Sequence, residues 1–194
     1  NTIFLAFISC IFIIILSLFI TYSSRIKKTK LNIFFKNLSS LGYAIPGSII
    51  AIGVIIPFIL LDNFFINFFK NNLNLNLNSI FSGSIFVLCF AYAVRFFTIS
   101  QTNIENAFYR ISRNFDNVSS VLGKKPLFTL FNVHIPIMSV SIVLSSILIF
   151  IEIVKELSAT LILRPFNFNT LTIQVYEFAT EDKIIESSIP SLVI

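Results

Sequence analysis

The sequence has little charge, a single histidine and no tryptophan. Only 12% of its 194 residues are Asp, Glu, Lys or Arg, whereas soluble domains carry about 25%. Hydrophobic residues make up 56% of the chain, and the mean hydropathy is +0.90. Several apolar runs are close to the roughly 20 residues that a helix needs to cross a bilayer. This composition excludes a soluble domain and indicates an all-α membrane protein with several spans.

The residue groups that catalysis or resident metal binding would need are also missing. His134 is the one histidine, no Gly-rich phosphate loop is present, and no two carboxylates share an apolar run. Cys10 and Cys89 lie in apolar runs without metal-binding or disulfide spacing, so we expect them to act as small buried hydrophobes. We therefore expect no enzyme and no cofactor in this chain, and no metal ligand can be assigned. If transport uses ATP, another chain must bind it.

Four apolar runs predict four complete spans, and the two chain ends extend this pattern. Asn1 opens directly into an apolar run without a charged n-region, and residues 189–194 resemble the start of a fifth span. We therefore expect a fragment cut at both ends. The four predicted spans are Thr2 to Tyr22, Leu41 to Leu61, Ser79 to Ser100 and Ile137 to Ile153.

The second span contains Pro46, Gly47 and Pro57. Proline removes a helical hydrogen bond and clashes with the preceding turn, so this span should be kinked or broken. The break could serve close helix packing, or it could line a water-filled path. Pro46 and Gly47 are candidate path residues on the second interpretation.

The basic residues are concentrated in two loops. Residues 23–36 and 101–134 together hold nine Lys or Arg. The segments expected on the other side of the membrane hold four, counting Lys155 at the outer end of the fourth span. Basic loops stay on the cytoplasmic side, so we expect both loops there. Residues 62–78 and 157–188 then lie outside. Membrane orientation explains the net charge of +5, and no nucleic-acid partner is needed.

The second basic loop carries signals for two helices, although a solvated interfacial loop is the alternative. Residues 104, 107, 108 and 111 are apolar and share a helical face. Asp116 can cap a helix from Asn117 to Leu122, and Gly123 can close it.

Further candidate positions lie within the spans and beyond the fourth one. Arg95 either reaches the headgroups or makes an interior polar contact. Glu152, Lys155 and Glu156 share a helical face, where they neutralise one another or line a transport path. Thr170 can cap a helix whose packed face is Leu171, Val175, Phe178 and Ala179; this helix is too short to span and should pack on the bundle or lie at the interface.

The stretch from Asp116 to Pro136 resembles the cytoplasmic signature of permease subunits of bacterial ABC importers. That signature has an acid and two alanines, a glycine, and a proline thirteen residues after the glycine. Gly123 and Pro136 keep this spacing. Asn117, Val118 and Ser119 replace the acid and the alanines, with Asp116 just before them. Three further stretches resemble the ferric-iron branch of this superfamily, namely 41–47, 91–96 and 155–168, and the likeness covers most of the chain after about residue 35.

The resemblance implies a polytopic helical bundle of the type I importer kind in the bacterial inner membrane, and this chain looks like the second half of such a permease. Residues 1–194 would be the transmembrane permease domain, and 101–134 the cytoplasmic coupling region. A cytoplasmic ABC ATPase would bind ATP, and a periplasmic protein would deliver the solute. The implied ATPase-docking residues are Asp116, Asn117, Val118, Ser119, Gly123 and Pro136.

Ferric iron is the substrate that the resemblance implies. It is a hard cation that prefers oxygen ligands, and in the outer segments acids exceed bases by seven to four. Thiamine, a polyamine or an oxyanion remain alternatives for the same machine. A secondary transporter would need acids within its spans, which are missing, and a structural scaffold is the third class. The candidate path residues are Pro46, Gly47, Glu152, Lys155, Glu156 and Arg164.

Overall fold

A computed structural model describes residues 1–27, 30, 34, 41–73 and 78–194. Every regular element among them is helical, which confirms the all-α polytopic fold. Lys28, Lys36 and 74–77 of the predicted loops lie outside the described residues. The helices are α1 (Thr2–Ile26), η1 (Gly42–Ala44), α3 (Gly47–Leu73), α4 (Ile85–Arg110), α5 (Asn114–Val121), α6 (Pro126–Thr129), η2 (Leu130–His134), α7 (Ile135–Ile137), α8 (Ser139–Lys155), α9 (Ser158–Leu163), α10 (Leu171–Thr180) and α11 (Ile184–Val193).

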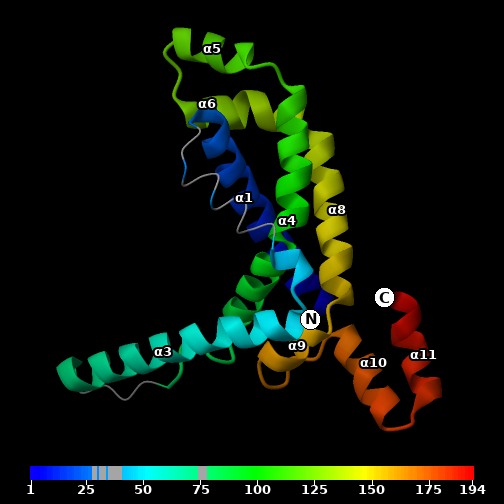
Figure 1. Cartoon of the computed structure of the whole chain (residues 1–194). Coiled ribbons are helices and arrows are strands. Elements are labelled where there is room, and N and C mark those ends of the chain that lie inside the picture. The colour runs from blue at the N-terminus through cyan, green and yellow to red at the C-terminus, as the bar shows by residue number, and fades with distance from the viewer. Residues whose placement is uncertain (28–29, 31–33, 35–40, 74–77) are drawn as a thin grey trace.

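Three long helices, α1, α4 and α8, pack against one another and form the bundle (Figure 1). Small residues let them approach closely, for example Ala6 and Ser9 on α1 and Ala91 on α4, all fully buried. The hydroxyls of Ser17 and Ser100 form a hydrogen bond between α1 and α4. Among the described residues, α1, α3 and α4 are long and apolar enough to cross a membrane, and a bent fourth pair brings the total to four.

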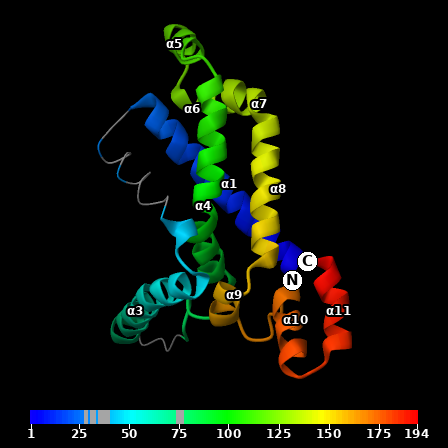
Figure 2. The ribbon, with the colours of Figure 1, turned by 45° about the vertical axis from the view of Figure 1, so that its right-hand side comes forward.

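The second span begins later and ends later than predicted. Its helix, α3, starts at Gly47 rather than Leu41, so the predicted break lies at Pro46 and separates η1 from α3. Pro57 lies inside α3. The helix continues to Leu73, which corrects the prediction of an outer loop from Asp62 onwards. Figures 1 and 2 show α3 running across the lower end of α4.

Asp62 organises the connection between α3 and α4. Its carboxylate is 3% exposed and accepts hydrogen bonds from the backbone N–H groups of Ile80, Phe81 and Ser82, at 2.7 to 2.9 Å, and from the Ser82 hydroxyl. A buried carboxylate needs such donors. The residue predicted as the start of a solvated loop therefore closes a hairpin.

Gly42 packs directly on the backbone of α4. A Cβ at this position would lie 2.1 Å from the carbonyl oxygen of Val94, whereas a Cβ at Gly53 would meet nothing within 4 Å. We therefore expect Gly42→Ala to destabilise the protein by about 1–3 kcal/mol through overpacking, because backbone atoms cannot move aside. Gly53→Ala should not destabilise it. Thermal unfolding of the purified variants checks this difference, and equal midpoints would contradict it.

The third span also extends beyond its predicted end. α4 continues to Arg110 and includes the amphipathic helix that we expected to be separate. The four residues of its predicted apolar face, Ile104, Ala107, Phe108 and Ile111, are all buried. The face is therefore confirmed, although it belongs to α4 and to the residue that follows α4.

The fourth span is bent. The segment Pro126–Ile137 meets α8 at an angle of 79°, with Met138 at the break. Pro136 lies in α7, before the bend, and the long helix of this span is α8, Ser139–Lys155, rather than the predicted Ile137 to Ile153.

The chain start and the last helices lie at the opposite end of the bundle from α5 (Figure 2). Thr170 occupies the N-cap position of α10 as predicted, although its side chain makes no capping bond. The N–H of Leu171 donates instead to Thr2 Oγ1 at 2.9 Å. Of the predicted face of α10, Leu171, Val175 and Phe178 are half-buried and Ala179 is exposed, whereas the buried residues of this helix are Thr172 and Ile173. Because Ile173 is fully buried, α10 packs on the bundle. α11 is a short apolar helix at the position of the expected fifth span.

Candidate functional site

α5 lies beyond the ends of α1 and α4 and continues through a tight turn into α6 (Figure 1). Gly123 closes α5 with a φ of +70°, a left-handed conformation that favours glycine. Its N–H donates to the Ser120 carbonyl at 2.9 Å, and that of Lys124 donates to the Ser119 carbonyl at 3.0 Å. Pro126 then occupies the first turn of α6. The predicted helix stop at Gly123 is confirmed, and α5 begins three residues before Asn117, at Asn114.

Asp116 does not cap α5, because its carboxylate faces the bundle. Asp116 Oδ2 accepts a hydrogen bond from Arg25 Nε at 2.8 Å. Its other oxygen, Oδ1, lies 2.7 Å from His134 Nε2. The carboxylate thus links α5 to the last turn of α1 and to η2, which corrects the prediction of a helix cap.

Arg25 connects three helices at this end of the bundle. Besides Asp116, its guanidinium donates to the carbonyls of Phe108, Ile111 and Ser112. These carbonyls lie in the last turn of α4 and just after it, where a helix leaves carbonyls without intrahelical partners; that of Phe108 also accepts the Ile111 N–H at 3.2 Å. The Arg25 side chain is 10% exposed. One cation therefore satisfies the end of α4 and positions α5.

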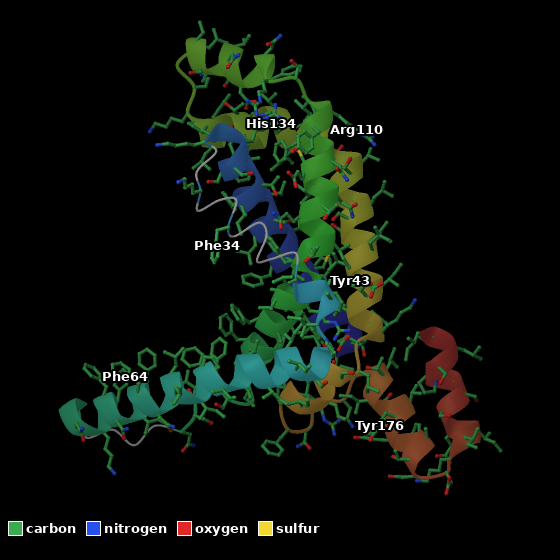
Figure 3. The ribbon with its side chains drawn as sticks, in the orientation of Figure 1. Phe34, Tyr43, Phe64, Arg110, His134 and Tyr176 are labelled. Carbon is green, nitrogen blue, oxygen red and sulfur yellow. The ribbon has the colours of Figure 1, made fainter. Side chains whose placement is uncertain are left out.

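Aromatic rings enclose the same cluster. His134 is fully buried, and its ring packs 5.3 Å from that of Tyr22 and 5.4 Å from that of Phe108. Figure 3 places His134 where α1 and the end of α4 meet the α6–η2 segment. The Tyr22 hydroxyl donates to the Pro126 carbonyl at 3.0 Å. We name Arg25, Asp116, His134 and Tyr22 the brace, because they hold α5 and η2 against α1.

An open apolar groove of about 360 Å³ lies between α5 and the α6–η2 segment. Val118 is 59% exposed and Leu122 is 69% exposed, and Lys124 stands at the edge of the groove. We name this surface the α5 groove; its apolar lining is Phe115, Val118, Leu122, Phe128 and Val133.

The predicted docking residues separate into two groups. Asn117, Val118, Gly123 and Pro136 are exposed. Ser119 is buried and its hydroxyl is bonded to that of Thr129 on α6, and Asp116 belongs to the brace. Sequence reasoning set His134 aside as a lone histidine and gave Arg25 no role beyond orientation. The only signal for them was that both flank a predicted span.

The candidate path residues lie at the other end of the bundle, and the structure brings only some of them together. Gly47 and Glu156 meet at Arg95, whose Nη1 donates to Glu156 Oε1 at 3.1 Å. The interior contact proposed for Arg95 is therefore present. Because α8 ends at Lys155 and Glu156 is extended, the predicted common face of 152, 155 and 156 is broken.

The remaining path candidates lie apart from this contact. Arg164 pairs instead with Glu177 at 3.0 Å. Pro46 directly precedes α3, Glu152 is half-buried and Lys155 is exposed. Within the described ranges, no group of three or more His, Cys, Asp or Glu side chains could hold a metal ion.

Comparison with known proteins finds relatives that are named as permeases of transport systems. No family model matches the sequence. The chain is 25% identical over 154 residues to the Fe(3+)-transport system permease protein FbpB 2 of Haemophilus influenzae, which covers 79% of this chain and 27% of that protein. It is 24% identical over 113 residues to the protein named as permease PhnV of a 2-aminoethylphosphonate transport system in Salmonella paratyphi A, which covers 58% of this chain and 43% of that one.

These relatives confirm the resemblance to bacterial ABC importer permeases that the motifs carried. The chain spans about a quarter of the length of the Haemophilus relative and somewhat less than half of the length of the Salmonella relative. Both are permeases of transport systems, and neither name describes an enzyme. Together with the apolar helices, they show that the chain is an integral membrane protein.

Proposed function

We propose that the chain is part of the permease subunit of an ATP-driven importer in the bacterial inner membrane. The observation that carries the proposal is α5: the brace fixes it to α1 and η2, and its exposed apolar residues Phe115, Val118 and Leu122 line an open groove with Phe128 and Val133. A rigid, braced helix with a free apolar face can transmit the motion of a bound partner. The partner would be a cytoplasmic ATPase, with 101–134 as the coupling region, and the chain itself would catalyse no reaction.

The substrate proposed is ferric iron, delivered by a periplasmic binding protein. One relative is named as an Fe(3+)-transport permease, and the outer segments are more acidic than basic. An oxyanion is the second candidate, because another relative is named for 2-aminoethylphosphonate transport and Arg95 supplies a cation inside the bundle. Uptake of radiolabelled iron and of phosphonate by a deletion strain, complemented with the gene, decides between them. Iron uptake that does not depend on the gene would overturn the first.

The turn at Gly123 provides a test of docking. Gly123→Val should weaken ATPase binding about tenfold, because a β-branched residue at a φ of +70° costs about 1–2 kcal/mol and moves the chain after α5. Gly83 is the matched control: its φ is +78°, and like Gly123 it has nothing within 4 Å of its Cβ position. Gly83→Val should carry the same strain and leave binding intact. Co-purification of the ATPase measures both, and full binding and uptake by the Gly123 variant would contradict the proposal.

A further inference from the structure

A partly buried ion pair joins the middle of α4 to the turn between α8 and α9. Arg95 Nη1 lies 3.1 Å from Glu156 Oε1, and the two side chains are 21% and 7% exposed. The same Glu156 oxygen accepts the N–H of Ala159 at 3.0 Å, so it also holds the first turn of α9. The Thr160 hydroxyl donates to the Glu156 carbonyl and is bonded to the Tyr92 hydroxyl of α4. The position of α9 against α4 therefore depends on this pair and its neighbours.

The pair leaves one donor unsatisfied. Arg95 Nε is buried and has no hydrogen-bond partner among the residues that the structure describes. A buried ion pair is strongly stabilising only when its remaining donors are bonded. If the Arg95–Glu156 pair separates and water reaches Arg95, the new hydrogen bonds to water offset part of the free energy lost with the ion pair. Charged residues within membrane-spanning helices are expensive, and they mark the paths of ions and substrates.

α3 starts directly against the pair. A Cβ at Gly47 would lie 1.8 Å from Arg95 Nη1 and 2.4 Å from Glu156 Oε1. Because these atoms end flexible side chains, an added methyl group would displace the pair without displacing the backbone. Three elements, α3, α4 and the α8–α9 turn, therefore meet at one breakable contact.

We propose that Arg95 and Glu156 form a latch that is closed in this structure and opens during transport. Opening would separate Arg95 from the α8–α9 turn and present the Glu156 carboxylate to the translocated cation. The proposal rests on the proposed function and adds the residues that gate its path.

Thiol labelling tests whether the latch opens. In the full-length protein, Cys10→Ser and Cys89→Ser remove the native thiols, and Ala159→Cys places one at a position that is 1% exposed. A water-soluble maleimide should label this thiol slowly at rest and about tenfold faster when Arg95→Gln or Gly47→Ala is added. In proteoliposomes with the ATPase, MgATP should produce a similar increase. Lys155→Gln, an exposed cation next to Glu156, and Gly53→Ala are the controls.

Each outcome decides the proposal. Labelling rates that are equal with and without Arg95→Gln and Gly47→Ala would overturn the latch, and so would rates that MgATP leaves unchanged while uptake is normal. If Arg95→Gln fails to fold, Gly47→Ala decides, because it keeps both charges. Uptake by the unsubstituted transporter tests the proposed function separately, since the comparison at rest requires neither ATP nor substrate.

Discussion

Replacing Val118 by aspartate is expected to release the ATPase partner and abolish uptake. Val118 lines the α5 groove and is 59% exposed, so the substitution leaves the permease fold intact. Docking would place the new carboxylate against apolar atoms, which costs about 2 kcal/mol or more because the charge loses its water. That penalty corresponds to an affinity at least about 30-fold lower. Co-purification of the ATPase and solute uptake in vesicles measure the effect.

Ser120→Asp is the matched control for this prediction. Ser120 is exposed on the same helix and does not line the groove, so the same charge is introduced on α5 outside the groove. Its variant should bind the ATPase and transport like the unsubstituted protein. Equal binding by the two variants would show that the α5 groove is not the docking surface, even if uptake is lost in both.

The helical fold was predictable because apolar runs of membrane length have few other structures available. The helix ends were not, because hydropathy follows the lipid boundary rather than the end of hydrogen bonding. α4 continues through Gln101 to Arg110 since residues such as Ile104 still have a buried face. α3 continues past Asp62 because that carboxylate bonds to the next turn of the chain rather than to water.

The candidate site was predictable where local geometry decides. Gly123 closes α5 because its positive φ suits glycine, and that rule needs only neighbouring residues. Asp116 was wrongly predicted as a cap because its stronger partners are remote: Arg25 is 91 residues away in sequence and His134 is 18 away. Periodicity within one helix cannot identify such partners.

The ion pair between Arg95 and Glu156 was likewise not predictable from local sequence patterns. The sequence left Arg95 with two interpretations and Glu156 with two, and no local pattern connected residues 61 positions apart. The structure shows the interior contact, with Gly47 at the start of α3 packed against both side chains. The sequence shows that position 47 is a glycine, but only the tertiary structure shows which side chains pack against it.

Replacing Arg25 by methionine is expected to loosen α5 from the bundle. The substitution keeps the apolar stem and removes the cation that bonds Asp116 and three carbonyls of the α4 end. Breaking a buried ion pair costs about 3–5 kcal/mol, and the 24% exposure of Asp116 lowers the expected loss to about 2 kcal/mol. Amide hydrogen exchange within α5 should therefore become about 30-fold faster.

Arg113→Met is the comparison for Arg25→Met, because Arg113 is an exposed cation at the start of α5 whose side chain makes no capping bond. Exchange in that variant should stay at the unsubstituted rate. Asp116→Asn should fall between the two, since the amide keeps a hydrogen bond and loses the charge. If the brace transmits ATPase motion, Arg25→Met should reduce uptake more than it reduces ATP hydrolysis by the assembled transporter. Unchanged exchange in α5 would show that Arg25 does not hold this helix, and a proportional loss of both activities would show that the brace does not couple ATP hydrolysis to uptake.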